Sequence, residues 1–169
     1  VNSDGSLSMT RKIVYDFDDS ANGVYYTQNL ASGQKVSGQS VEVKDLASGK
    51  TVKPALNNQA TSGNVYHFNK DGNSYKFKVY HHVEDGKVQV VYRYKISGAV
   101  DSYEDASELN FKIVGDGWDK EISNVTTTVR FQDKNLSFLK GWAHVNANGH
   151  LIVDKEKGLV KAEVATLPE

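Results

Sequence analysis

The chain has 169 residues, of which 38% are hydrophobic and 24% charged, and its formal net charge at pH 7 is -1. This length fits one domain that buries a core. The balanced charge argues against nucleic-acid binding, which needs a basic surface, and no apolar run approaches the roughly 20 residues that span a bilayer. The lack of cysteine excludes disulfides, thiol catalysis and Cys-based zinc sites, and favours an extracytoplasmic origin, since many secreted proteins of Gram-positive bacteria have none.

Period-two alternation of apolar and polar residues dominates the chain and predicts β-strands. The first run is Leu7–Phe17, in which Arg11 is the lone charge on the apolar face. Further strands are predicted, in chain order, at Val24–Leu30, Gly38–Lys44, Val65–Asn69, Leu109–Val114, Val125–Phe131, Gly141–Asn146, Leu151–Val153 and Leu159–Ala165, with a short hairpin arm at Ala47–Lys53. Ser102–Asp105 has the composition of a single capped helical turn.

The clearest alternation runs from Tyr75 to Ile96 and is interrupted at Asp85-Gly86. Asp-Gly suits the two central positions of a type I′ turn, which require positive φ. The sequence therefore predicts a β-hairpin in which Glu84 faces Lys87, and in which the apolar residues of both arms share one face.

Many short strands separated by polar turns, without a long amphipathic helix or an internal repeat, predict an all-β protein. We expect a β-sandwich of antiparallel strands, immunoglobulin-like in general style, with residues 1–169 forming a single domain. The chain begins at Val1 without Met, so we expect it to be an excised segment of a longer protein.

Metal-binding patterns are incomplete. Asp18, Ser20, Asn22 and Gly23 match the start of an EF-hand loop, but Asn29 stands where the bidentate Glu is needed, which favours a turn. His81 and His82 are adjacent on a strand, so their side chains leave opposite faces, and His81 is expected to be a hydrogen-bonded core residue. His144 and His150 flank a turn, but two ligands are too few. We predict neither a metal nor a cofactor.

Catalytic motifs are also sparse. The chain has no Gly-x-Ser-x-Gly elbow, no His-Glu-x-x-His helix and no phosphate-binding glycine loop. The carboxylates of Asp101, Glu104, Asp105 and Glu108 are the one set that would suit a glycosidase acid and base. Charged loops are more often solvated, so we predict that the chain is not an enzyme and keep a glycan-active enzyme as an alternative.

The segment Asp101–Val125 contains, in order, Tyr103, Asp105, Glu108-Leu109, Phe111, Gly115, Trp118 and Asn124-Val125. With these residues it resembles a signature of the domain-of-unknown-function 2207 family of predicted bacterial membrane proteins. Three further stretches are similar in the same order: the opening "DGSLSMTRKIVYDFDDSANGVYYTQNL", the strand from Val90 to Val100, and "GWAHVNANG" from Gly141 to Gly149.

This resemblance implies an N-terminal extracytoplasmic module at the bacterial cell surface, attached to the membrane through segments absent from this chain. We expect a non-enzymatic binding, sensing or spacer domain with an unknown protein or cell-envelope partner. The alternative is a carbohydrate-binding module that stacks sugars on exposed rings; Tyr26, Tyr103 and Trp142 are the candidate platform, with Tyr25 and Tyr80 as further candidates. Asp105, Glu108 and Trp118 are interpreted as structural signature residues.

Overall fold

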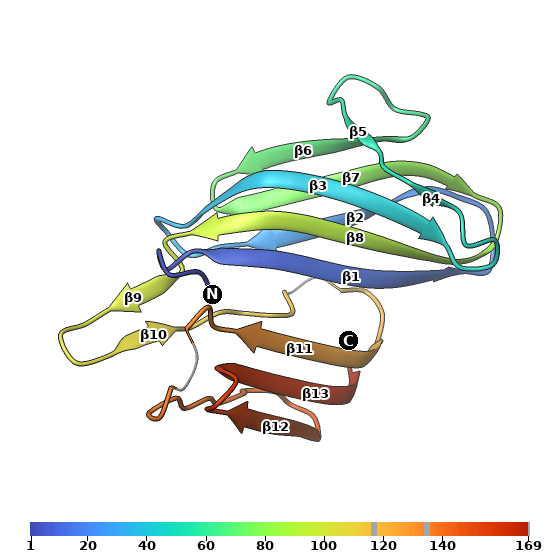
Figure 1. Cartoon of the computed structure of the whole chain (residues 1–169). Helices are drawn as coiled ribbons and strands as arrows, with labels where there is room; N and C mark the ends of the chain where they lie inside the picture. Colours follow the sequence, from blue (N-terminus) through green and yellow to red (C-terminus); the bar gives the residue numbers. More distant parts are fainter. Residues whose placement is uncertain (116–117, 134–135, 169) are drawn as a thin grey trace. The chain divides into compact units, whose positions relative to one another are not determined.

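The computed structural model describes residues 1–115, 118–133 and 136–168, and these contain strands but no helix (Figure 1). They fall into two compact units: Leu7–Ala99, called here the sandwich unit, and Val1–Ser6 with residues 100–169, called the second unit. The all-β prediction is confirmed, whereas the prediction of a single domain and the immunoglobulin-like style remain predictions.

The sandwich unit contains two four-stranded sheets. The first has the order β1-β8-β3-β4, with β1 at Leu7–Phe17, β8 at Gly86–Ser97, β3 at Lys35–Asp45 and β4 at Thr51–Val52. The second has the order β2-β7-β6-β5, with β2 at Ala21–Asn29, β7 at Ser74–Val83, β6 at Val65–Asp71 and β5 at Ala55–Leu56. All pairings are antiparallel except that of β5 with β6.

The predicted hairpin between Tyr75 and Ile96 is wrong. Its two arms are β7 and β8, which belong to opposite sheets, and Lys87 pairs with Asp16 of β1 rather than with Glu84. Alternation determines which residues point inward. It does not distinguish two strands that are paired in one sheet from two strands that face each other across the core in different sheets. The Asp85-Gly86 turn therefore connects the sheets.

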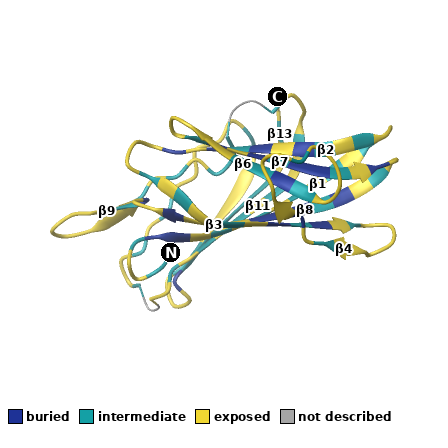
Figure 2. Ribbon diagram, turned by 90° about the horizontal axis from the view of Figure 1, so that it is seen from above, coloured by how far each residue is buried: buried dark blue, intermediate teal, exposed yellow. Residues whose placement is uncertain are grey.

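The core of the sandwich unit lies between these two sheets. Every buried hydrophobic residue among those described belongs to Leu7–Ala99 (Figure 2). Phe77 of β7 is central: its ring contacts those of Tyr26, Tyr66, Phe68, Tyr92 and Tyr94, with centroids 4.9 to 6.3 Å apart. Such aromatic contacts add to the free energy gained by burying apolar area.

The second unit contains a two-stranded and a three-stranded sheet. β9 at Val100–Ser102 pairs with β10 at Ser107–Leu109, and the order β11-β13-β12 joins Ile122–Arg130, Leu159–Leu167 and Gly149–Asp154. Val1–Ser6 belongs here because the Gln132 amide donates to the carbonyl oxygen of Val1 at 2.9 Å.

Three local predictions in the second unit are wrong. Ser102–Asp105 is not helical but leads into the tip of the β9–β10 hairpin, where the Tyr103 amide donates to the Ala106 carbonyl at 2.8 Å. The strand predicted at Leu109–Val114 ends at Leu109, and Gly141–Asn146 is not a strand. The latter residues alternate like a strand but pair with no neighbouring strand in the described structure.

Candidate functional site

A groove of about 490 Å³ lies in the sandwich unit beside β3. Its lining residues come from four strands and the linker between β4 and β5: Ser40, Val41, Glu42, Lys53, Pro54, Leu56, Tyr66 and Arg93. Val41, Pro54 and Tyr66 are buried and give the groove an apolar floor, while Leu56 is exposed. The volume lies within the range of about 300–1,000 Å³ typical of ligand sites.

The groove runs beside an open strand edge. Among the described residues, β4 is the strand that pairs with this edge of β3. It pairs only with Val43 and Lys44 of β3. The pairing of β3 with β8 is irregular between Ser37 and Ser40, where Gly38 takes φ +61°. Tyr66 fixes this irregular stretch, since its hydroxyl donates to the Gln39 carbonyl at 3.1 Å. A bulged edge next to a groove is a typical position for a strand-like ligand.

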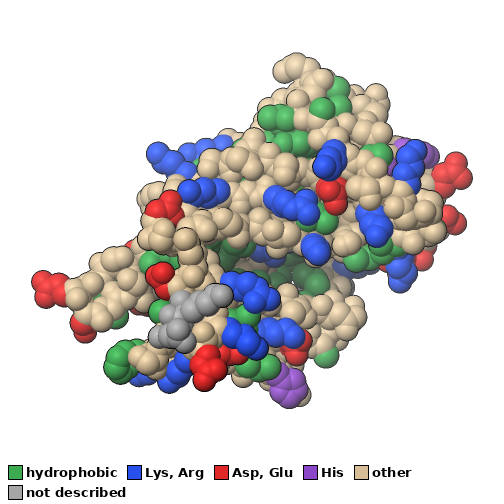
Figure 3. Space-filling view, in the orientation of Figure 1, with side chains coloured by type: hydrophobic (Ala, Val, Ile, Leu, Met, Phe, Trp, Pro, Cys, Tyr) green, Lys and Arg blue, Asp and Glu red, His purple; other side chains and the backbone are tan. Residues whose placement is uncertain are grey.

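The charges around the groove are mainly positive. Lys53 and Arg93 line it together with Glu42, and Arg93 Nη1 lies 3.9 Å from Glu42 Oε2. Further Lys and Arg side chains spread over the outer face of β1, β8 and β3 (Figure 3). The sandwich unit has twelve Lys and Arg against eight Asp and Glu, a net charge of +4, whereas the second unit has eight against thirteen, a net charge of -5.

The outer face of the other sheet of the sandwich unit carries a row of rings and a cation. Tyr25, Lys78 and His67 are paired across β2, β7 and β6. Lys78 Nζ lies 5.3 Å from the Tyr25 ring centroid and 4.9 Å from that of Tyr80. Hydrogen bonding to the Tyr80 and Tyr25 hydroxyls raises the pKa of Lys78. The lysine is thereby held charged between two rings.

Tyr26 does not belong to any exposed platform, because it is only 5% exposed and its ring lies in the core. Its hydroxyl donates to Gln28 Oε1 at 2.8 Å and lies 3.1 Å from the Tyr94 hydroxyl. Burial raises the pKa of Tyr26 and that of Tyr92, and raises the pKa of Tyr15 to about 12. These tyrosines stay neutral and form a buried polar cluster.

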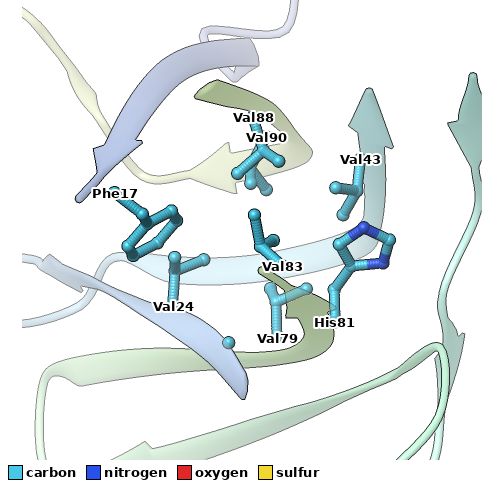
Figure 4. A pocket seen from close by; sticks show the side chains of 9 residues that line it. Phe17, Val24, Val43, Val79, His81, Val83, Val88 and Val90 are labelled. Carbon is cyan, nitrogen blue, oxygen red and sulfur yellow. The ribbon is translucent and has the colours of Figure 1, made fainter. Parts of the chain in front are cut away.

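A small cavity of about 10 Å³ lies within the core between β7 and β8 (Figure 4). Val79, Val83, Val88 and Val90 line it, with the His81 ring at its margin. The cavity is no larger than one water molecule needs, and its lining is apolar. His81 is half-buried, its Nδ1 lies 2.8 Å from Asn64 Oδ1, and burial lowers its pKa, as expected for a hydrogen-bonded core histidine. The cavity is too small for a ligand.

The carboxylates proposed for catalysis lie on the β9–β10 hairpin. Asp101 pairs directly with Glu108, and Glu104 and Asp105 lie at the tip between them. All four are exposed. Within the described ranges, no group of three or more His, Asp or Glu side chains is arranged to hold a metal ion.

Two of the predicted platform residues, Tyr103 and Trp142, are exposed, at 61% and 75%. Tyr103 follows β9, Trp142 lies in the segment between β11 and β12, and among the described rings neither contacts the other. A binding role for them remains a prediction, as does the structural role of Asp105 and Glu108. Trp118 is half-buried, which leaves its structural role open as well.

Sequence reasoning missed the groove. Its residues come from β3, β5, β6, β8 and a linker, and their spacing forms no motif. The one sequence signal was Gly38 inside an otherwise alternating strand, which indicates a bulge. The row formed by Tyr25, Lys78 and His67 was missed because it depends on the pairing of β2 with β7 and of β7 with β6, which no sequence pattern predicted.

The comparisons with known proteins agree with the family resemblance. The search found no significant match among curated proteins or among solved structures. The described residues include no helix long and apolar enough to cross a membrane. The family described as "Predicted membrane protein (DUF2207) N-terminal domain" matches residues 1–169, and the chain therefore belongs to this family.

Proposed function

We infer that the chain is a non-catalytic binding module, on the extracytoplasmic side of a membrane protein, which accepts an extended peptide along the edge of β3. The observation that carries this proposal is the groove of about 490 Å³ beside a strand edge that β4 covers only at Val43 and Lys44. An extended peptide that adds a strand to such an edge gains main-chain hydrogen bonds, while the groove selects its side chains.

The lining predicts which peptide would fit best. Successive residues of an added strand point to opposite faces. Every second residue of the peptide would place an apolar side chain against Val41, Leu56 and the ring of Tyr66. The residues between them would reach Lys53 and Arg93, which favour an acidic side chain. The expected ligand is therefore an extended segment that alternates apolar and acidic residues.

The extracytoplasmic placement is supported by two features. The family consists of predicted membrane proteins, and the chain has no cysteine thiol that an oxidising compartment would oxidise. The exposed carboxylates on the β9–β10 hairpin favour a solvated hairpin over a catalytic centre, which supports a non-catalytic role.

The test begins with a display library of random nonapeptides selected on the chain, followed by calorimetry with the enriched peptide. Lys53→Glu is expected to weaken binding roughly tenfold, because it reverses a charge at the rim of the groove. Lys76→Glu is the matched control, since Lys76 is an exposed lysine of the other sheet. The amide NMR signals of residues 40–42 should shift when the enriched peptide is added.

Enriched peptides without acidic residues, or equal binding by the Lys53→Glu and Lys76→Glu variants, would contradict the peptide proposal. Shifts confined to β2 would contradict the position of the site.

Glycan binding is a second candidate, favoured by the exposed Tyr25 ring beside Lys78. The test is sedimentation with intact cell wall and purified peptidoglycan. Tyr25→Ala should reduce retention, whereas Tyr103→Ala should not. Tyr103 is a matched control because its exposed fraction, 61%, is close to the 58% of Tyr25. Tyr26→Ala is unsuitable, since it would leave a cavity in the core. Retention that neither substitution changes would argue against this face.

A further inference from the structure

The two most exposed large hydrophobic side chains among the described residues lie four residues apart in the second unit. Phe138 is 91% exposed and Trp142 is 75% exposed. Both belong to the segment of residues 136–145, called here the aromatic segment, which connects β11 to β12. Single exposed apolar residues are ordinary, but two large aromatic side chains in one short segment indicate an interaction site.

The local structure holds the aromatic segment in place. The Leu136 amide donates to the Lys155 carbonyl, and the Leu139 amide donates to the Leu136 carbonyl, each at 2.9 Å. Gly141 lies so close to the three-stranded sheet that a Cβ atom there would be 2.9 Å from Val160 Cγ1 and 3.4 Å from Val153 Cγ2. The segment is thus tied at its start to the turn after β12 and in its middle to the apolar sheet face.

This attachment decides which side chains point outward. Val160 and Val153 are paired, and Val129 of β11 pairs with Val160 on its other side, so these valines form a row on one sheet face. Leu136, Leu139 and Gly141 are partly buried, whereas Phe138, Lys140 and Trp142 are exposed. The contact of Gly141 with the valine row leaves no space for the Trp142 ring beneath the segment.

Charges near the aromatic segment nearly balance. Lys140, Lys155 and Lys157 stand against Asp154 and Glu156, and Lys157 Nζ lies 3.6 Å from Asp154 Oδ2. A strongly charged partner would therefore gain little here. Two aromatic rings with a lysine between them are the side chains that favour the interface between lipid and water, where the rings enter the headgroup layer and the ammonium stays hydrated.

We propose that Phe138 and Trp142 insert into the headgroup layer of the bilayer that carries the protein. The chain belongs to a family of predicted membrane proteins, so a bilayer is the surface within its reach. Two rings bind more weakly than one myristoyl chain, whose association constant is only about 10⁴ M⁻¹. Attachment to the same membrane raises the effective lipid concentration and makes such weak binding sufficient. The proposal is independent of the β3 groove.

Flotation of the chain with phosphatidylcholine vesicles tests this docking, at lipid concentrations up to about 5 mM because binding is weak. Replacing both rings, Phe138→Ser with Trp142→Ser, should reduce the bound fraction on the order of tenfold. Tyr103→Ser, which removes an exposed ring of the same unit, should leave it unchanged. Raising the salt from about 0.1 to 0.5 M should change it less than about twofold, since screening acts on charges and not on ring burial.

Brominated lipids provide a second readout. They should quench the fluorescence of the intact chain more than that of a Trp142→Phe variant, because the other tryptophan, Trp118, is half-buried. Unchanged thermal unfolding and unchanged peptide binding in the double variant would show that only the docking was removed.

Three results would overturn the proposal: no flotation at any lipid concentration, equal flotation of the double variant, or flotation lost at high salt. Self-association that disappears in the double variant, together with no flotation, would identify a second copy of the chain as the occupant and would also overturn it.

Discussion

Replacing Gln28 with leucine should destabilise the sandwich unit by about 1.5–4.5 kcal/mol. Gln28 lies in the core, where its Oε1 accepts hydrogen bonds from the Tyr26 and Tyr94 hydroxyls, both at 2.8 Å. Its Nε2 donates to the Asn29 carbonyl at 2.9 Å. Leucine has a similar size but offers neither the acceptor nor the donor, so the substitution removes polar contacts with little loss of packing.

The magnitude follows from which groups lose a partner. The two hydroxyls are 3.1 Å apart, so in the variant one of them can still donate to the other. One buried hydroxyl is left without an acceptor, which costs about 1–3 kcal/mol. Loss of the bond to the Asn29 carbonyl adds about 0.5–1.5 kcal/mol.

Urea denaturation followed by circular dichroism measures this change. A shift of the midpoint is interpreted as a change in the free energy of unfolding only if the m-value is unchanged. The variant that combines Gln28→Leu with Tyr26→Phe and Tyr94→Phe should regain at least about 1 kcal/mol, because it removes the stranded donors as well as the acceptor. Tyr25→Phe, an exposed position on the same strand, should change stability by no more than about 0.5 kcal/mol. A cost below about 0.5 kcal/mol for Gln28→Leu, or a triple variant no more stable than the single one, would refute the reasoning.

The remaining predictions concern pH, one glycine and local stability. Burial raises the pKa of Tyr15 to about 12 and raises those of Tyr26 and Tyr92, whereas tyrosine ionises near ~10 in an unfolded chain. The folded state keeps these protons longer, so stability that is complete below about pH 10 should fall towards about pH 12, by up to ~1.4 kcal/mol per pH unit for each tyrosine. Urea midpoints across this range check it, and full tyrosine ionisation near pH ~10 without unfolding would contradict it. Gly23→Ala should destabilise far more than Gly49→Ala in the same assay, because a Cβ at Gly23 would lie 2.0 Å from the Val79 carbonyl oxygen, whereas none of the neighbours of Gly49 is within 4 Å; equal effects would contradict the close approach. Amides of the second unit should exchange with deuterium faster than those of the sandwich unit, since no large hydrophobic residue described there is buried; uniform protection would contradict this.

Several elements of the fold could be predicted because alternation is a local property. The strand predicted at Leu7–Phe17 has the observed bounds of β1, and the strand predicted at Leu159–Ala165 lies within β13. The inward direction of Phe77 and Tyr92 was also predictable, since period two assigns each residue to a face.

Strand order could not be obtained in this way. The Asp85-Gly86 turn fits a hairpin as well as a crossing between sheets, and the pairing of Lys87 with Asp16 depends on residues about 70 positions apart. The position of Tyr26 is a different case. Its ring was assigned to the outside, whereas the alternation of the predicted strand Val24–Leu30 places it on the same face as Val24 and Leu30, which are buried with it.

The two units leave different parts of a sheet uncovered, and the proposed binding sites follow from this difference. In the sandwich unit two apolar faces close on each other, so the parts left for recognition are the outer faces and the strand edges. One of these edges is that of β3, which β4 covers only at Val43 and Lys44. Backbone groups at an edge can recognise another chain. In the second unit a segment that pairs with no strand among the described residues lies against the apolar face at Gly141. Such a segment has two sides, and while Gly141 faces the sheet, Trp142 must face away from it. An exposed edge thus favours a peptide and an exposed pair of rings favours a lipid surface, which is why we assign the two partners to different units.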